Sequence, residues 1–323
     1  MLKADKTELG RKAAELGFNR DSYEKMIRLT EVLQFINTNK ELNPLLALKG
    51  RTAINLTVFN LPRLSVDIDL NFSENLTRDD TMEKRNYLNE LIGRYMKDEG
   101  YTIKEEASKR THALYSFVFS YKNAGGNRDN VKVETNYMLR CHVLSVIDCM
   151  TNASDAFLPF RVRTLSPEEI FAGKINALTG RAAIRDLYDT NNMVNEGVFD
   201  ETGLEMLRKC TVFYLVLSGE SGSLSFSLSK ISELVFRDVK TDLLPMTRKT
   251  ERFDLEAAKK NVTSFLSELL KLPENETAFL KRFAKGRYEP QLLFDDKDIL
   301  DRIKNHPMAI WRTQRIRERQ QER

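Results

Sequence analysis

The stretch LKGRTAINLTVFNLPRLSVDIDLNF (residues 48–72) carries the pattern that decides the fold. Apolar side chains occupy the even positions of residues 66–72, and Asp67, Asp69 and Asn71 occupy the odd ones. This period of two is typical of a β-strand with one buried face. Because residues i and i+2 of a strand project to the same side, the stretch predicts a strand that presents two carboxylates on one face.

The segments on either side of this strand predict a region that mixes helices and strands. Apolar residues recur every three to four positions in the helical segments, whereas the extended segments alternate or form short apolar runs. The last two extended segments flank the polar turn NAGGN (residues 123–127), which predicts a hairpin. Helices are expected over residues 21–36, 53–59 and 78–99, and strands over 45–48, 101–105, 112–121 and 131–138.

The character of the sequence changes near residue 165. Beyond it the pattern is mostly helical, and only residues 212–217 leave the choice between helix and strand open. This half begins with SPEE (residues 166–169), which places Ser at the N-cap, Pro at N1 and Glu at N3 of a helix, as in a capping box. We therefore expect two domains, residues 1–165 and 166–323, a number that suits a chain of 323 residues.

Composition excludes several classes of protein. The 51 Lys and Arg against 47 Asp and Glu give a formal charge of +4, too small to indicate nucleic-acid binding by itself. No apolar run approaches the roughly 18 residues of a membrane span, and the N-terminus lacks the apolar core of a secretory signal. The three cysteines match no zinc spacing. These features predict a globular cytoplasmic protein without a membrane partner.

The C-terminal tail holds nearly all of the excess charge. Its last 22 residues contain seven Lys and Arg and two Glu, a net charge of +5. These cations could contact RNA phosphates, or they could belong to a solvated helix. Trp311 could stack on a base, but its expected role is to dock the tail against the body of the protein.

Asp67 and Asp69 are the strongest candidates for metal ligands. Two like charges on one face of a strand repel each other, and Mg²⁺ would relieve that repulsion because it binds carboxylates together with phosphate oxygens. In residues 131–134 apolar and polar residues also alternate, and Glu134 faces outward with the polar ones. Three carboxylates would therefore meet if the two strands are neighbours. Such a set suits two-metal phosphoryl transfer. The alternative is a polar strand face exposed to solvent.

Two motifs of the chain resemble those of the AbiEii/AbiGii nucleotidyltransferase toxin family, whose relatives include the mycobacterial MenT toxins. The family pattern is a Gly-Gly-Thr-Ala-type turn, a helix, Arg-x-Ser and then Asp-x-Asp on a strand. Residues 48–70 resemble it, with Arg63 and Ser65 in the Arg-x-Ser positions. AGKINAL (residues 172–178) and RDLYD (residues 185–189) resemble the second motif.

This resemblance implies an α+β protein with a DNA-polymerase-β-like nucleotidyltransferase core, a mixed sheet flanked by helices, followed by a helical C-terminal domain. It implies transfer of a nucleotidyl group from a nucleoside triphosphate, with Mg²⁺ (or Mn²⁺), to an RNA acceptor, expected to be the 3′ end of tRNA. It also implies a cognate antitoxin and a role in abortive-infection defence against phage. In this interpretation Asp67, Asp69 and Glu134 hold the metals, and Glu134 could instead draw the proton from the attacking hydroxyl.

The first motif also supplies candidate nucleotide-binding residues. Gly50 and Thr52, at a turn before a helix, would offer a backbone N–H and a hydroxyl to the phosphates. Arg63 and Ser65 would contact the nucleotide or hold the loop by hydrogen bonds. Where the family typically has a second Gly, this chain has Arg51, which could bind the triphosphate or impair the enzyme. The alternative function is therefore a catalytically impaired protein of the same fold that binds a nucleotide or a partner.

The second motif supplies Lys174 and Asp186 as candidate catalytic residues. Lys174 would neutralise the triphosphate, although a lysine beside a buried stripe is usually a snorkelling surface residue. Arg181 and Arg185 would lie one turn apart if the helix continues, and Asp186, preferred over Asp189, would be the functional acid. The alternative is that these charges only join two helices by salt bridges. A protein hydroxyl as acceptor, or transfer of a phosphate, would use the same carboxylates.

Overall fold

The computed structural model describes residues 5–152, 154–218 and 224–322. The chain forms two compact units. Unit 1 comprises residues 1–140, 146–165 and 244–251, and unit 2 comprises residues 141–145, 166–243 and 252–323. None of the helices in the described ranges combines the length and the apolar character that a membrane span requires.

Unit 1 is built on one mixed sheet of eight strands. The strand order is β3-β5-β6-β2-β1-β8-β7, with β4 paired to β5. The pairs β2–β6 and β1–β8 are parallel and the others antiparallel, which confirms the expected α+β class with a mixed sheet. The strands are β1 (Leu46–Lys49), β2 (Asp67–Phe72), β3 (Thr102–Ile103), β4 (Lys109–Arg110), β5 (Leu114–Lys122), β6 (Arg128–Asn136), β7 (Ile147–Met150) and β8 (Arg161–Thr164).

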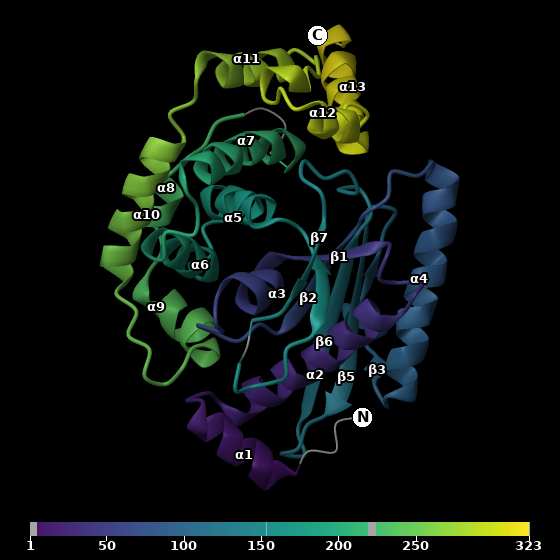
Figure 1. The fold of residues 1–323 in the computed structure, drawn as a ribbon, viewed down its shortest axis with the longest axis vertical. Helices are drawn as coiled ribbons and strands as arrows, with labels where there is room; N and C mark the ends of the chain where they lie inside the picture. The colour runs from purple at the N-terminus through teal and green to yellow at the C-terminus, as the bar shows by residue number, and fades with distance from the viewer. Residues whose placement is uncertain (1–4, 153, 219–223, 323) are drawn as a thin grey trace. The chain divides into compact units, whose positions relative to one another are not determined.

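The apolar face of β2 lies in the core of unit 1, as its alternation predicts. Ile68, Leu70 and Phe72 are almost fully buried. Helix α2 packs against β2, β6 and β8, and a ring stack between Phe35 of α2 and Tyr95 of α4 joins the two helices beside the sheet (Figure 1). The helices of unit 1 are α1 (Lys6–Glu15), α2 (Arg20–Thr38), α3 (Gly50–Ala53), the π-helical turn Ile54–Val58, α4 (Arg78–Asp98) and the 3₁₀ turns Glu105–Ala107 and Leu244–Met246.

Unit 2 is helical. Helix α5 packs on α6 and α7, and α6 packs on α10 (Figure 1). Residues 212–217 lie within α7 and are buried, which explains why their sequence shows no amphipathic period. The helices are α5 (Pro167–Arg181), α6 (Ile184–Asn195), α7 (Glu201–Ser218), α8 (Ser229–Ser232), α9 (Phe236–Asp238), the π-helical turn Val239–Leu243, α10 (Leu255–Leu269), α11 (Glu274–Phe283), the 3₁₀ turn Pro290–Leu292, α12 (Lys297–Ile303) and α13 (Pro307–Gln321).

The start of α5 has half of the predicted capping box. The Ser166 hydroxyl accepts a hydrogen bond from the Glu169 backbone N–H, and Pro167 is the first helical residue. The Glu169 carboxylate, however, accepts hydrogen bonds from the backbone N–H groups of Val143 and Leu144. The reciprocal half of the predicted box is therefore wrong, because two buried amides from another segment bind the carboxylate.

The helix that starts at Pro167 ends at Arg181. Ala182 follows in the left-handed conformation (φ 51°), and α6 begins at Ile184. Arg181 and Arg185 therefore belong to different helices, and the expectation that they lie one turn apart on a continuous helix is wrong. A left-handed residue stops the α-helical hydrogen-bond ladder.

Candidate active site

Three neighbouring strands place charged side chains in a row across the sheet of unit 1. In the antiparallel pair β1–β2, Lys49 lies opposite Asp69, and in the parallel pair β2–β6, Asp69 lies beside Glu134. One step along the same ladder, Asp67 lies beside Lys132. Side chains opposite one another on adjacent strands share a face. The structure thus brings Asp67, Asp69 and Glu134 to the same part of the sheet.

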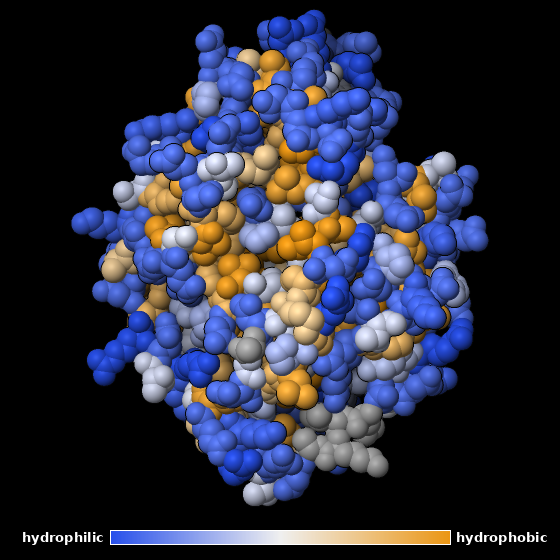
Figure 2. Space-filling view, in the orientation of Figure 1, coloured by the Kyte–Doolittle hydropathy of each residue, from blue (hydrophilic) through white to orange (hydrophobic). Residues whose placement is uncertain are grey.

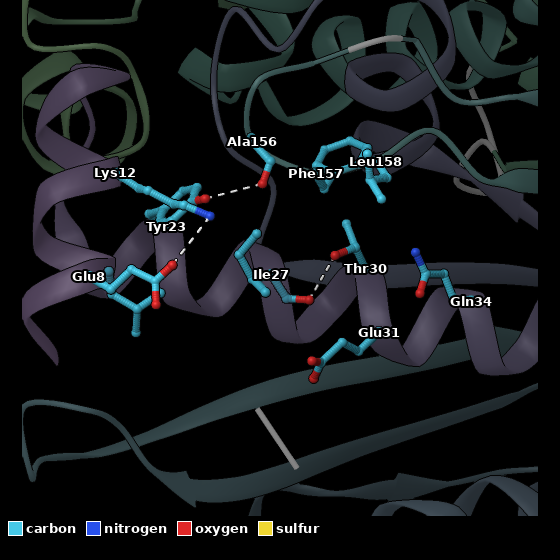
Figure 3. Close-up of a pocket in the computed structure, with 11 residues that line it drawn as sticks. Glu8, Lys12, Tyr23, Ile27, Thr30, Glu31, Gln34, Ala156, Phe157 and Leu158 are labelled. Carbon is cyan, nitrogen blue, oxygen red and sulfur yellow. Dashed lines mark hydrogen bonds and ion pairs between the residues drawn. The ribbon is translucent and has the colours of Figure 1, made fainter. Parts of the chain in front are cut away.

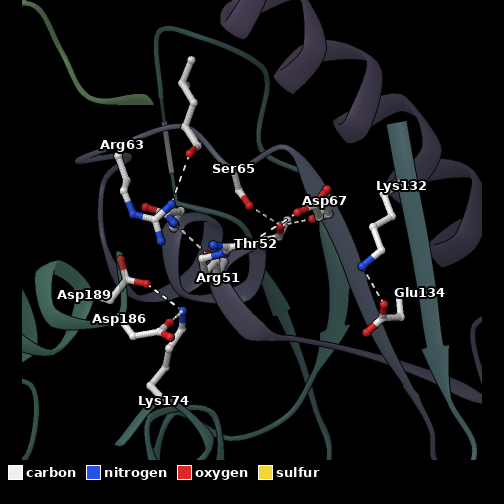
Figure 4. A network of polar contacts seen from close by, with 12 residues as sticks. Arg51, Thr52, Arg63, Ser65, Asp67, Lys132, Glu134, Lys174, Asp186 and Asp189 are labelled. Carbon is white, nitrogen blue, oxygen red and sulfur yellow. Dashed lines mark hydrogen bonds and ion pairs between the residues drawn. The ribbon is translucent and has the colours of Figure 1, made fainter. Parts of the chain in front are cut away.

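Asp67 and Glu134 each pair with a basic side chain of unit 1 (Figure 4). The Arg51 guanidinium lies 3.3 Å from Asp67, and Lys132 Nζ lies 2.6 Å from Glu134 Oε2. No three His, Cys, Asp or Glu side chains within the described ranges form a ready-made metal cluster. Asp67 and Glu134 are thus held by ion pairs with Arg51 and Lys132, and Lys49 acts on Asp69 through its charge.

Burial and mutual repulsion alter the ionisation of the central carboxylate. Burial raises the pKa of Asp69, the charge of Lys49 opposes that shift, and the negative charge of Glu134 adds to it. Burial lowers the pKa of Lys49, against the attraction of the same two carboxylates. Burial also tends to lower the pKa of Lys132, but the hydrogen bond to Glu134 and the nearby carboxylates outweigh it and raise that pKa. Burial is thus the main cause that disfavours the ionised form of Asp69, and the neighbouring charges act in both directions.

The turn that enters α3 lies directly against Asp69. Gly50 has a φ of +67°, and a Cβ atom at this position would stand 2.7 Å from Asp69 Oδ2. Thr52 donates a hydrogen bond to the backbone carbonyl of Asp67 and lies 2.6 Å, oxygen to oxygen, from the Ser65 hydroxyl. Since the Thr52 proton is used at Asp67, Ser65 must be the donor to Thr52. Both hydroxyls therefore fasten the turn to the strand that carries the carboxylates.

Arg63 is almost fully buried and serves the backbone of unit 1. One of its guanidinium nitrogens donates to the Leu64 carbonyl at 3.3 Å, and its backbone pairs with Thr247. The backbone N–H of Leu64 donates to the Met246 carbonyl at 2.7 Å. Arg63 was expected either to contact the nucleotide or to hold the loop, and these contacts favour the second role.

In unit 2, Lys174 is the centre of a buried ion cluster (Figure 4). Its Nζ lies 2.7 Å from Asp186 Oδ1 and 2.9 Å from Asp189 Oδ2, and the side chain is 7% exposed. The exposed side chain of Arg181 also pairs with Asp186, at 3.4 Å from Asp186 Oδ2. Lys174 is therefore not a snorkelling surface residue, and α5 and α6 are joined by one lysine between two aspartates.

Lys49 and Lys132 lie at the site but are not among the residues that the sequence predicts there. Their positions in the sequence could have pointed to them. Lys49 directly precedes Gly50, and Lys132 lies two residues before Glu134 and therefore on the same face of the strand. Only the pairing register shows that both lysines face the carboxylates.

The donor chemistry of the carboxylate face suits a divalent metal, although Asp67, Asp69 and Glu134 do not stand as a ready-made three-ligand cluster. Asp67, Asp69 and Glu134 offer hard oxygen donors of the kind that Mg²⁺ and Mn²⁺ bind. The upward shift of the Asp69 pKa shows that burial and neighbouring charge disfavour its negative form, a condition that a bound cation relieves. The donor types and the electrostatics are both consistent with the metal that this class of chemistry requires.

A hollow of about 320 Å³ elsewhere in unit 1 is lined by none of the candidate residues. It lies between α1, α2 and residues 156–158 (Figure 3). Its polar groups bond mainly to one another, since Tyr23 donates to the Ala156 carbonyl and Thr30 to the Ile27 carbonyl. We therefore place the candidate active site on the carboxylate face and not in this hollow.

Comparison with known proteins gives the family. Residues 34–286 match the family described as nucleotidyl transferase AbiEii toxin, type IV toxin–antitoxin system. The fold is similar to that of MenT4, a nucleotidyltransferase toxin from Mycobacterium tuberculosis, with a TM-score of 0.64 and 15% sequence identity over 95% of this chain and 99% of that one. No protein of curated function matches the sequence. The family match spans most of the chain, and the protein therefore belongs to the AbiEii family of nucleotidyltransferase toxins of type IV toxin–antitoxin systems.

Proposed function

We propose that this toxin transfers a nucleotidyl group from a nucleoside triphosphate to an RNA acceptor, expected to be the 3′ end of tRNA, on the carboxylate face of unit 1. The observation that carries the proposal is the register of β2 and β6, which sets Asp69 beside Glu134 and leaves Asp67 one step away on the same face. Three carboxylates on adjacent strands are the donor set that two-metal nucleotidyl transfer requires.

Asp67, Asp69 and Glu134 would hold Mg²⁺ or Mn²⁺. When bound, the metal would neutralise phosphate charge and lower the pKa of the attacking hydroxyl. Glu134, at the edge of the set, could instead accept the proton of that hydroxyl. Catalysis of this kind consists mainly of positioning and charge neutralisation, so the protein needs few other reacting groups.

The phosphates would be bound by residues around the turn at the start of α3. The Gly50 backbone N–H is the expected donor, since Thr52 and Ser65 hold the turn in place. Arg51 would add its guanidinium to the phosphates only by releasing Asp67. We also propose Lys174 and Asp186 as residues of the same enzyme's active site, on the strength of the family motif. Because two aspartates already engage Lys174, its charge is pre-positioned, and its rotamer is fixed before substrate binds.

Helix α13 supports RNA as the acceptor. It carries four arginines and one glutamate, and Glu318 is engaged by Gln314. Arg315 lies over the ring of Trp311, and this ring is 51% exposed, so part of its surface could stack on a base. Exposed aromatic rings between arginines are typical of surfaces that bind single-stranded RNA. Hydrophilic residues dominate this end of unit 2 (Figure 2).

The decisive test is incorporation of label. Purified toxin, Mg²⁺, each α-labelled nucleoside triphosphate and total tRNA are incubated, and the label is followed in RNA and in protein. We expect label in RNA, and Asp69→Asn and Glu134→Gln should each lower its rate by about a hundredfold or more. The exposed variants Asp98→Asn and Glu106→Gln serve as matched controls. Label in protein would identify a protein hydroxyl as acceptor, and nucleotide binding without any transfer would support the impaired alternative.

The role of α13 is tested separately by tRNA binding. Arg315→Gln should weaken binding and reduce the slope of log affinity against log salt by roughly 1, because one phosphate contact is lost. Arg94→Gln, an exposed arginine of α4 paired with Glu90, is the control. A salt slope that stays the same in Arg315→Gln would exclude this arginine from the RNA contact.

The impaired alternative has a specific observation in its favour. The Arg51 guanidinium is bonded to Asp67, a proposed metal ligand, at 3.3 Å. An arginine in the phosphate turn can therefore occupy the oxygen that a metal would need.

A further inference from the structure

Lys132 of β6 lies among all three candidate metal ligands. It is beside Asp67 in the parallel ladder, and it shares its strand face with Glu134 two residues later. Its Nζ lies 2.6 Å from Glu134 Oε2. The charges of Glu134, Asp67 and Asp69 all act on this ammonium. One lysine thus pairs with Glu134 and lies within the electrostatic influence of the other two carboxylates.

This pair differs from an ordinary surface ion pair. Exposed lysine–carboxylate pairs contribute little because water screens them, whereas the side chains of Lys132 and Glu134 are 35% and 23% exposed. Arg51 bonds Asp67, and Lys49 lies opposite Asp69. Each of the three carboxylates therefore already has a basic side chain beside it or opposite it before any metal binds.

We propose that Lys132 is a built-in competitor of the divalent metal, which keeps metal affinity low until a nucleoside triphosphate is present. The proposal rests on the proposed function, because it takes Asp67, Asp69 and Glu134 as the metal ligands. A metal that binds alone must displace the ammonium from Glu134 and leave it beside another cation. Repulsion between like charges at such a distance opposes binding.

A triphosphate removes this penalty. Its anionic oxygens can bind the displaced ammonium, which sits on a flexible four-carbon stem. Metal and nucleotide should therefore bind cooperatively, and by thermodynamic reciprocity each should raise the affinity for the other by the same factor. Lys132 would restrict assembly of the loaded site to conditions in which both components are present.

The test is Mn²⁺ binding to the full-length chain, followed by the electron paramagnetic resonance signal of free Mn²⁺ and without nucleotide. Lys132→Met, which keeps the length of the side chain and removes its charge, should bind Mn²⁺ about tenfold more tightly than the wild type. Lys132→Arg, which keeps the charge, and Lys122→Met, at an exposed position of β5, should stay within about twofold of the wild type. A nucleotide analogue with a non-hydrolysable α–β bond should raise Mn²⁺ affinity in the wild type more than in Lys132→Met.

A second measurement separates binding from folding. Mn²⁺ should raise the melting temperature of Lys132→Met by more than that of the wild type, and Lys132→Gln repeats the test if the Met variant does not give a native circular dichroism spectrum. Equal or weaker Mn²⁺ affinity in Lys132→Met, with Asp69→Asn abolishing binding, overturns the role of Lys132 alone. Absence of Mn²⁺ binding in every variant, with and without nucleotide, overturns the proposed metal site as well.

Discussion

Gly50 lies so close to Asp69 that a Cβ atom on it would stand 2.7 Å from the Asp69 Oδ2 oxygen. The same glycine has a φ of +67°, a backbone conformation that side-chain-bearing residues rarely adopt. The phosphate turn and the central carboxylate are thus fitted to each other, and the first residue of α3 is glycine for two independent reasons.

Gly50→Ala should lower both stability and activity. The left-handed conformation costs a non-glycine residue about 1–2 kcal/mol, and the new methyl group must also push Asp69 aside. Urea unfolding and label incorporation measure the two effects. Gly93→Ala in α4 is the matched control, since a Cβ atom there meets nothing within 4 Å and a helical Gly→Ala change is expected to stabilise by about 1 kcal/mol. An active Gly50→Ala variant of wild-type stability would contradict this account of the turn.

Arg51→Gly should raise the rate of nucleotide incorporation. Removal of the guanidinium frees the Asp67 oxygen that it holds at 3.3 Å. A partly exposed pair of this kind contributes about 0.2–1 kcal/mol, so the gain should be about 1.5-fold to fivefold. Arg51→Ala, which removes the charge without adding backbone freedom, should behave similarly. If both variants incorporate label more slowly than the wild type, Arg51 binds the triphosphate and does not impair the enzyme.

Lys174→Met should destabilise unit 2 strongly. The substitution removes the buried cation that lies between Asp186 and Asp189, and breaking a buried ion pair costs about 3–5 kcal/mol. The free energy of unfolding, measured in urea, should fall by this amount, whereas the exposed control Lys260→Met should change it little. Loss of activity in Lys174→Met at temperatures where the protein is unfolded would then say nothing about phosphate binding.

A second substitution distinguishes the two roles of Lys174. Lys174→Met combined with Asp189→Asn should recover part of the lost stability, because one of the two buried negative charges is removed with the lysine. If this folded double variant is also inactive, Lys174 has a role in the reaction beyond joining α5 to α6. Full activity of the double variant would restrict Lys174 to a structural role.

Glu169 should make stability depend on pH. Burial raises the pKa of this carboxyl from 4.5 to about 7, against the hydrogen bonds from Tyr214, Val143 and Leu144. Since the folded protein holds the proton more tightly than the unfolded chain, this contribution to stability is fully present below about pH 4.5 and is lost as the pH rises toward 7. The free energy of unfolding should fall by about 3 kcal/mol over this range from this group.

Glu169→Gln should remove that part of the pH dependence. The amide oxygen can still accept from Val143 and Tyr214, which both bond the same oxygen of Glu169, and the amide has no proton to lose between pH 4 and about 8. The difference in unfolding free energy between wild type and Glu169→Gln should therefore change with pH, whereas the exposed control Glu106→Gln should give a constant difference. A constant difference for Glu169→Gln would show that Glu169 does not titrate in this range.

The local features of the site could be predicted from the sequence. The period of two over residues 66–72 was enough to place Asp67 and Asp69 on one face of a strand, because that period follows from backbone geometry alone. The residue types in SPEE (residues 166–169) were enough to place the N-terminus of α5, because an N-cap hydroxyl and a proline at N1 act within one turn.

The partners of these residues could not be predicted in the same way. Glu169 reaches Val143 and Leu144, about 25 residues earlier in the chain, instead of its own N-cap. Lys174 is buried because the chain turns at Ala182, after α5, so that α6 packs against α5 and places two aspartates beside the lysine. No pattern within one helix contains this information, since burial depends on which other segment covers the side chain.

The sequence by itself determined which residues carry charge and which way they face along each strand or helix. Only the tertiary structure decided that β2 lies between β6 and β1. The register of the two pairs sets Asp69 between Glu134 and Lys49. The physical reason is that side-chain direction is a local property of the backbone, whereas strand order and register depend on how the whole apolar surface of unit 1 is buried at once.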